Sequence, residues 1–308
     1  MKTFLNVLFF ILLMTSCGKT STTGETTDKF KVLSWNIWHG GHEKAYPEKG
    51  CEGTLGLLKA SQADVVLMIE TYGASAQVAD ALGYYHRLFS SNLSVYSRYP
   101  IVETYTFPDS IASFNFGGVM IDKCGKKIRI FDTWLHYLPD TRKVPTSEGE
   151  EAILAWDDAG TRDDEARKIL NVLKPYLAEA DSIPVIMGGD FNSHSHLDWT
   201  EETKDMYHHG GAVVNWTVSK LMENAGFKDS FREMNPDPVK CLGETWLWTG
   251  DEMNRLDRID FIYYQGANIK AISSTAHTGV LGRDYNYNGQ NYFYASDHGF
   301  VETVFEIK

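Results

Sequence analysis

The chain has little of two features that often decide the class of a protein. Its 308 residues include only four cysteines, and their spacings match no zinc-binding pattern. It also has no long stripe of lysine and arginine, and the formal net charge is −12. This charge disfavours tight non-specific binding to nucleic acid. An acidic enzyme that cuts phosphate esters through a bound metal remains open.

The number of cysteines also limits the number of disulfides. Beyond Cys17, the cysteines are Cys51, Cys124 and Cys241. Three thiols cannot all pair, so at most one disulfide forms within the chain. Buried thiols or one incidental bridge are expected, rather than a redox or metal role.

Only one long apolar run is present, from Phe4 to Met14, and Lys2 precedes it. The run is short for a transmembrane helix and is typical of an export signal. The letters "MTS" before Cys17 resemble a bacterial lipobox. We therefore expect residues 1–16 to be cleaved and Cys17 to carry lipid, which would anchor an exported protein to a bacterial membrane, facing the periplasm or the cell surface. Cleavage of an ordinary signal peptide nearby is the alternative.

Residues 17–29 are polar and predict a flexible tether. Residues 30–308 contain no linker, repeat or low-complexity block, and 43% of the whole chain is hydrophobic. This composition predicts a single globular domain. Short strand-like runs recur along it with fewer helix-like segments between them, which predicts an α/β sandwich.

Two helices are predicted most clearly, over 161–178 and over 214–224. Apolar residues recur with the helical period from Ile169 to Leu177. Pro175 is expected to kink or shorten the first helix.

Two surface segments have open interpretations. Residues 147–167 hold eight acids and two arginines, which is typical of a solvated face, although part of the segment could form a rim around a site. Residues 285–298 are rich in tyrosine and asparagine. They predict a turn supported by aromatic packing, with a substrate-stacking rim as the alternative.

Polar residues stand where apolar strands end. In "GDFN", alternation places Asp190 and Asn192 on one face and turns Phe191 into the core. The buried run from Val65 to Ile69 ends at Glu70, where a carboxylate can meet a metal or water instead of the core.

The same reasoning applies to three other motifs. In "SWNIW", Asn36 points away from its apolar neighbours, and in "RIDFIYY" Asp260 faces away from Ile259 and Phe261. In "SDHG", Asp297 and His298 are adjacent, so their side chains should aim differently and perform different tasks.

Each of these residues also has a purely structural explanation. Asp190 and Asn192 could form a turn, Asp260 could pair with Arg258 or Arg255, and His136 could be a core histidine. Glu70 could cap a helix, and Asn36 could hydrogen-bond a loop. Together, however, they supply what hydrolysis of a phosphate ester needs. That is a hard cation on oxygen ligands, a base, and groups around the developing charge.

Seven motifs in order, "SWNIW", "LMIET", "YSRYPI", "FDTWLH", "GGDFN", "RIDFIYY" and "SDHG", resemble the endonuclease/exonuclease/phosphatase superfamily. They extend from Asn36 to His298. The resemblance implies a four-layer α/β sandwich, with two packed mixed β-sheets flanked by helices and a site at one edge of the sheets. It also implies that Glu70 binds Mg²⁺ or Mn²⁺, with Asn36 beside it and Asp297 completing or supporting the metal site.

The resemblance further implies the catalytic roles. Asp190 would orient or deprotonate the attacking water, and Asn192 would hydrogen-bond a phosphate oxygen. His298 would contact the scissile phosphate, with Asp260 holding its ring and raising its pKa. His136 would contact phosphate or assist the leaving group. Water would attack in line, without a covalent enzyme intermediate.

The chain departs from the family pattern at its histidine motif, which reads "TWLHY" instead of the usual "THL" or "THxDH". This shift makes the role of His136 the least secure of the set. Arg162 and Arg167 are both candidates for the arginine that usually follows. Arg98 supports the site or forms a structural ion pair.

The sequence therefore predicts a monomeric metal-dependent phosphoesterase. Its substrate class stays open among nucleic acid, sphingomyelin or another phospholipid, and sugar or inositol phosphates. A non-catalytic surface module that binds glycan or lipid on the same fold is the alternative. Against it, a binding module has no physical reason to keep a metal carboxylate, a base and an Asp–His pair together.

Overall fold

The computed structural model describes residues 28–42, 45–248 and 255–308. The expected signal, nearly all of the tether and Cys17 lie outside the described residues. In the part of the chain that is described, no helix combines the length and the apolar character needed to cross a bilayer. Cys51, Cys124 and Cys241 are all free thiols, so none of the three is in a disulfide.

One six-stranded sheet has the strand order β13-β16-β1-β2-β4-β3. Its centre is β1 (Asp28–Asn36), which runs parallel to β2 and antiparallel to β16. Its other strands are β2 (Val65–Ile69), β3 (Tyr85–Leu88), β4 (Ser94–Ser97), β13 (Ile269–His277) and β16 (Phe300–Ile307).

The second six-stranded sheet has the order β5-β6-β7-β8-β12-β9. Here β7 and β8 are parallel, and β12 runs antiparallel to β8. Its strands are β5 (Ile101–Thr104), β6 (Phe116–Lys123), β7 (Lys126–Trp134), β8 (Val185–Asp190), β9 (Lys228–Asp229) and β12 (Asp260–Gln265).

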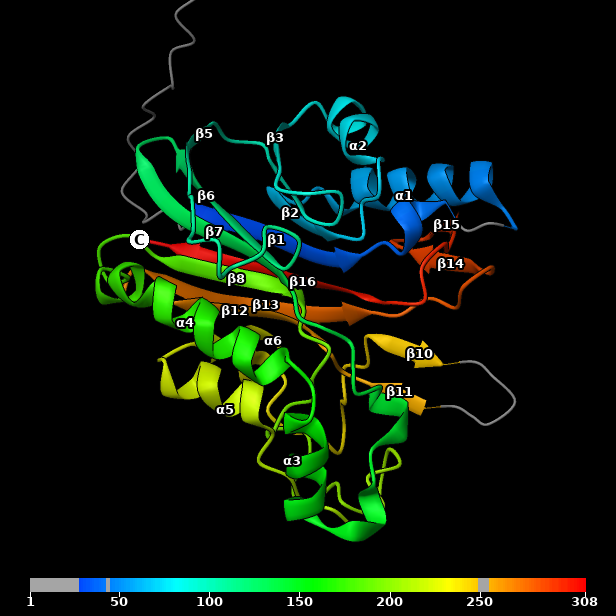
Figure 1. Ribbon diagram of the computed structural model, residues 1–308. Coiled ribbons are helices and arrows are strands. Elements are labelled where there is room, and N and C mark those ends of the chain that lie inside the picture. Colours follow the sequence, from blue (N-terminus) through cyan, green and yellow to red (C-terminus); the bar gives the residue numbers. More distant parts are fainter. Residues whose placement is uncertain (1–27, 43–44, 249–254) are drawn as a thin grey trace, which may run out of the picture.

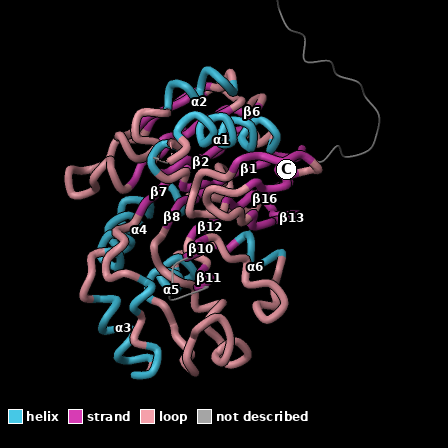
Figure 2. The backbone as a smooth tube through the Cα atoms, turned by 90° about the vertical axis from the view of Figure 1, so that its right-hand side faces the viewer, coloured by secondary structure: helices cyan, strands magenta, loops and turns pink. Residues whose placement is uncertain are grey.

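The two sheets pack face to face, and helices cover both outer faces (Figures 1 and 2). On one side lie α1 (Pro47–Ser61) and α2 (Ser75–Leu82), and on the other α4 (Arg162–Ala178) and α5 (Thr217–Asn224). Two further helices are α3 (Glu150–Asp158) and α6 (Ser230–Met234). Two antiparallel strand pairs are β10 (Trp246–Trp248) with β11 (Arg255–Asp257) and β14 (Asp284–Tyr287) with β15 (Gln290–Phe293). Short 3₁₀ turns lie at His39–Gly41, Thr141–Lys143 and Thr146–Glu148. The predicted four-layer α/β sandwich is confirmed.

Strand alternation builds this layering. On β1, Val32 faces the core between the sheets, whereas Leu33 and Trp35 face the core under α1 and α2. On β8, Ile186 faces the inter-sheet core and Met187 the core under α4 and α5. Each strand is apolar on both faces because both faces are covered.

The predicted helices form, with differences at their ends. The first extends through Pro175 to Ala178, so the proline does not end it. Pro175 lies three residues from the helix end, so its missing N–H donor and the crowding of its ring affect only the last turns of the helix. The second begins at Thr217, later than expected from the sequence, with Trp216 at its N-cap position.

The acidic segment 147–167 is not simply a solvated face. It forms α3 and the start of α4, and Asp157 and Asp163 are only 1% and 2% exposed. Arg162 is fully buried and forms an ion pair of 2.8 Å with Asp157. Burial of a charge requires such a partner, and sequence charge counting cannot reveal it.

The tyrosine- and asparagine-rich segment forms the β14–β15 hairpin. Asn288 and Gly289 both have positive φ at its turn, as a two-residue hairpin loop requires. A side chain at Gly53 of α1 would collide with the carbonyl oxygen of Phe293, so the hairpin packs tightly on that helix. The interpretation as a turn supported by packing fits this arrangement, and the stacking-rim alternative stays untested.

Candidate active site

The polar residues gather where the inner faces of the strands end. In the second sheet, Trp134, Asp190 and Asp260 occupy one row across β7, β8 and β12. Their inner-face neighbours one step deeper are the buried Asp132, Gly188 and Ile262. The row therefore lies at one end of the gap between the sheets, beside Asn36 at the end of β1.

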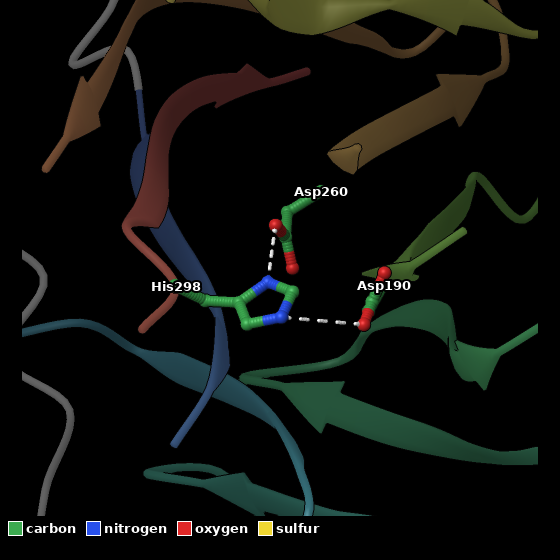
Figure 3. A group of neighbouring side chains, drawn as sticks. All are labelled: Asp190, Asp260 and His298. Carbon is green, nitrogen blue, oxygen red and sulfur yellow. Dashed lines mark hydrogen bonds and ion pairs between the residues drawn. The ribbon is translucent and has the colours of Figure 1, made fainter. Parts of the chain in front are cut away.

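His298 lies between two carboxylates of this row (Figure 3). Its Nδ1 is 2.9 Å from Oδ2 of Asp260, and its Nε2 is 3.8 Å from Oδ2 of Asp190. The first distance is a hydrogen bond and the second is too long for one. The ring is therefore oriented by Asp260, and its Nε2 faces the Asp190 carboxylate across a gap.

These contacts change the protonation of both groups. Burial alone would lower the pKa of His298, but Asp260, Asp190 and Asp297 outweigh it and raise that pKa well above its usual value. Burial raises the pKa of Asp190 to about 7, although His298 opposes the shift. The carboxylates therefore favour a proton on His298, while burial favours one on Asp190.

Glu70 closes the site from the first sheet. Its backbone has a positive φ of 57°, and its N–H donates to Oδ1 of Asn92 at 2.9 Å. Its carboxylate accepts from Nδ2 of Asn36 and from the backbone N–H of His39, each at 3.3 Å. The side chain is half-buried, so one side of the carboxylate faces solvent.

Asn36 connects the two sheets. Its Nδ2 donates to Glu70 and, at 3.1 Å, to Oδ2 of Asp190. Its Oδ1 accepts from the N–H of Trp38 at 3.0 Å, so the amide presents N–H rather than oxygen to the carboxylates. The prediction that it faces away from its apolar neighbours is met.

The donor set suits a divalent cation. One ligand atom from each of Asp190, Asp260 and His298 lies within 4.8 Å of the others. Oδ1 of Asp260 and Oδ1 of Asp297 are buried without a hydrogen-bond partner. Carboxylate oxygens left unpaired in this way are what a hard cation satisfies. Glu70 and Asp297 flank the cluster through Asn36 and His298, respectively.

Asn192 and His136 lie at the margin. Because β8 ends at Asp190, alternation no longer determines where Asn192 points, and its Nδ2 donates to the carbonyl of Leu135 at 2.8 Å. His136 stands beyond the end of β7, where its ring packs 5.0 Å from that of Tyr137. In register, Trp134 lies opposite Asp190 instead.

The arginines have structural roles. Arg162 donates to the backbone carbonyls of Asn192 and Pro139 in addition to its pair with Asp157, so it holds the loop behind Asp190. Arg167 is half-exposed and pairs with Asp164 on its own helix. Arg98 pairs with Asp64, and Arg258 is bound by Asp198 and Asp229 rather than by Asp260.

Several residues near the centre were not predicted from the sequence. The half-buried Trp246 lies in register with His298 and donates from Nε1 to Oδ2 of Asp297 at 3.4 Å. Arg142 lies over its ring at 5.7 Å. Asn92, which holds Glu70, has no motif that would reveal it. For Trp134, the available sequence signal was the motif "TWLH", which departs from the usual "THL".

Comparisons agree with this architecture. Residues 33–298 match the family described as "Endonuclease/Exonuclease/phosphatase family". An uncharacterized protein of Caenorhabditis elegans, F14F9.5, is 28% identical over 281 residues, which cover 85% of this chain and 86% of that protein.

Solved structures share the fold at low identity. D. rerio TDP2, complexed with single strand DNA product, superposes with a TM-score of 0.58 at 16% identity, covering 90% of this chain and 99% of that one. An endonuclease/exonuclease/phosphatase family protein of Bacteroides thetaiotaomicron gives a TM-score of 0.56 at 13% identity, covering 92% and 99%.

Proposed function

The chain belongs to the endonuclease/exonuclease/phosphatase family, and from this premise we propose that it is a divalent-metal-dependent hydrolase of phosphate diesters. The observation that carries the proposal is the convergence of Asp190, Asp260 and His298 at one end of the sandwich. An imidazolium beside two carboxylates suits charge stabilisation at phosphorus.

The residues divide the work as follows. Asp190 takes the proton of the attacking water, whose oxygen forms a bond to phosphorus as the opposite P–O ester bond breaks. His298 stabilises the charge on the phosphate oxygens, and Asp260 keeps its ring oriented and charged. No covalent enzyme intermediate is formed.

Glu70 and Asp297, with Asn36 beside them, would hold Mg²⁺ or Mn²⁺, which when bound polarises the phosphate and neutralises developing charge. Asn192 would donate to a phosphate oxygen, at the expense of its bond to Leu135. His136 would assist the leaving group from the loop after β7.

Substrate hydrolysis tests the proposal directly. Bis-p-nitrophenyl phosphate should be cleaved with Mg²⁺ or Mn²⁺, lose turnover in EDTA and regain it when metal is restored. The Asp190→Asn variant is the blank. Undiminished turnover in EDTA would contradict the metal-dependent mechanism and leave only the family assignment.

A substrate panel at fixed Mg²⁺ separates the classes that the family allows. DNA and RNA, sphingomyelin, and sugar or inositol phosphates are compared, each against the Asp190→Asn blank. Nucleic acid merits inclusion because D. rerio TDP2 was solved with single strand DNA product. Binding of glycan or lipid without hydrolysis of any phosphate ester would instead support a non-catalytic module.

The N-terminal sequence supports the proposal that the chain is exported and lipid-anchored, facing the periplasm or the cell surface. We also propose that the protein is a monomer. Labelling with a radioactive fatty acid in a bacterial host should mark the wild-type chain and not Cys17→Ala. Equal labelling of both would remove the lipid anchor from the proposal.

A further inference from the structure

Trp134 stands beside the proposed base. It is the last residue of β7, in parallel register with Asp190, so the two side chains project from adjacent strands on the same face. Neighbouring strands are about 4.8 Å apart, so the two side chains start from adjacent positions on that face.

The position of Trp134 is fixed by Asn115. The N–H of Trp134 donates to the Asn115 carbonyl at 2.9 Å, and the Asn115 Nδ2 donates back to the Trp134 carbonyl at 3.1 Å. The indole itself is half-buried. Its ring lies 5.6 Å from that of Phe114 and 6.2 Å from that of Tyr137, which is 52% exposed.

Trp134, Phe114 and Tyr137, which we call the Trp134 wall, are connected to Glu70, the proposed metal ligand. Asn92 donates from Nδ2 to the carbonyl of Phe114 at 2.8 Å, while its Oδ1 holds the N–H of Glu70 at 2.9 Å. One asparagine therefore ties the wall to Glu70.

A second aromatic group is linked to Glu70 through His39. The N–H of His39 donates to Oε2 of Glu70, and the His39 ring lies 4.7 Å from Trp38 and 6.1 Å from Tyr72. Tyr72 is 42% exposed. Both aromatic groups are therefore linked to Glu70, one through Asn92 and the other through the N–H of His39.

The chemistry of this rim selects flat rings. Among the described residues, the exposed aliphatic side chain next to the Trp134 wall in sequence is Leu138, which alone offers little area to an acyl chain. The net charge of −12 does not suit a long polyanion held by its backbone. Aromatic faces beside a phosphate-cutting centre suit unpaired bases, which stack without sequence preference.

We propose that the Trp134 wall is a stacking subsite, so that the site prefers phosphodiesters with an unpaired planar base next to the scissile bond. This proposal rests on the proposed phosphodiesterase function. It assigns Trp134 a role in substrate binding and specificity, distinct from the chemistry of Asp190 and His298.

A matched pair of substrates tests the subsite. One is a short single-stranded oligothymidylate, and the other is the same strand with abasic tetrahydrofuran sites, so that phosphates are equal and bases are absent. Wild type should cleave the base-bearing strand with the higher kcat/KM. Trp134→Ala should reduce this preference about tenfold or more, largely through KM, and Trp134→Phe should retain most of it.

Two further measurements keep the test decisive. If Trp134→Ala does not fold, Tyr137→Ala removes an exposed ring of the same wall and should reduce the preference in the same direction. Tyr85→Ala, on β3, removes another exposed ring as a control and should leave the preference unchanged. In the Asp190→Asn background, the base-bearing strand should quench tryptophan fluorescence more than the abasic strand.

The outcomes separate the two proposals. Equal kcat/KM values of the wild type for the two strands would overturn the stacking subsite. So would a loss of kcat/KM in Trp134→Ala that is equal for both strands. Metal-dependent cleavage of sphingomyelin or another phospholipid, with neither strand cut, would overturn it as well and leave the phosphodiesterase function standing. Failure to hydrolyse any phosphate ester with metal would overturn both.

Discussion

The Nδ1 atom of His298 lies 2.9 Å from Oδ2 of Asp260, across a sequence separation of 38 residues. The carboxylate fixes the ring and favours its charged form, because it is an opposite charge in a buried setting. This relationship gives the histidine a pKa well above its usual value despite burial that acts the other way.

Replacing Asp260 by Asn should therefore shift the pH–rate profile. The amide cannot stabilise the imidazolium by charge, so the pKa of His298 should fall and the alkaline limb of kcat/KM should move to lower pH. Steady-state rates between pH 5 and 10 measure this. An unchanged alkaline limb would show that Asp260 does not control the protonation of His298.

Asp190→Asn and His298→Ala should each reduce kcat by roughly 10²-fold or more, the scale of a lost base or charge-stabilising group. Asparagine keeps an oxygen that can accept the N–H of Asn192, which donates to Asp190 at 2.9 Å, so the local fold should persist. Circular dichroism verifies folding. Near-wild-type rates in folded variants would remove these assignments.

Glu70→Gln should weaken metal binding because it removes a charge while preserving shape. The Mg²⁺ concentration for half-maximal activity should rise by roughly tenfold or more, since even partners outside the ligand shell change metal affinity on that scale. The Mg²⁺ dependence of Tm gives a readout independent of turnover. Glu52→Gln, at an exposed position on α1, is the control. An unchanged Mg²⁺ requirement would show that Glu70 does not bind the metal.

Arg162→Met should destabilise the fold by about 3–5 kcal/mol, because it leaves the buried carboxylate of Asp157 without a partner. Lys204→Met is the control, since its ion pair with Glu201 is exposed and should contribute less than about 1 kcal/mol. Urea unfolding measures both. Equal effects would show that the burial of Arg162 is not what stabilises this region.

Stability should also decline in acid through His209. Burial lowers the pKa of this histidine to about 4, and its ring stacks 4.0 Å from Trp199. Between about pH 6.5 and 4 the unfolded chain binds a proton at this site that the folded chain does not. The free energy of unfolding should therefore fall as pH decreases through that window.

His209→Phe keeps a ring against Trp199 and has nothing to titrate. Its unfolding free energy should depend less on pH between 6.5 and 4 than that of wild type, as urea titrations at several pH values would measure. Identical pH slopes would assign the acid sensitivity to other groups.

Local patterns were enough to find much of the candidate site. Asn36, Glu70 and Asp190 each stand at the end of a strand whose apolar run is legible in the sequence. Alternation then dictates the inner or outer face, because it depends on backbone geometry alone. Asp260 and His298 were recognisable from their motifs, and the structure brings them to hydrogen-bonding distance.

Other features depend on partners distant in sequence. The burial of Arg162 requires Asp157 and the loop at Asn192, and charge counting in that segment predicts an exposed face instead. The bond from Glu70 to Asn92 follows from how β2 and β4 are connected, and no motif marks it.

By itself, the sequence determined the layered fold and the identity of the polar strand ends, because the periodicity of apolar residues is a local property. Only the tertiary structure decided that Trp134, rather than His136, stands opposite Asp190. That choice is made by the register of two parallel strands whose connection spans α3 and α4. Register is set by packing of the whole sheet, so no short stretch of sequence contains it.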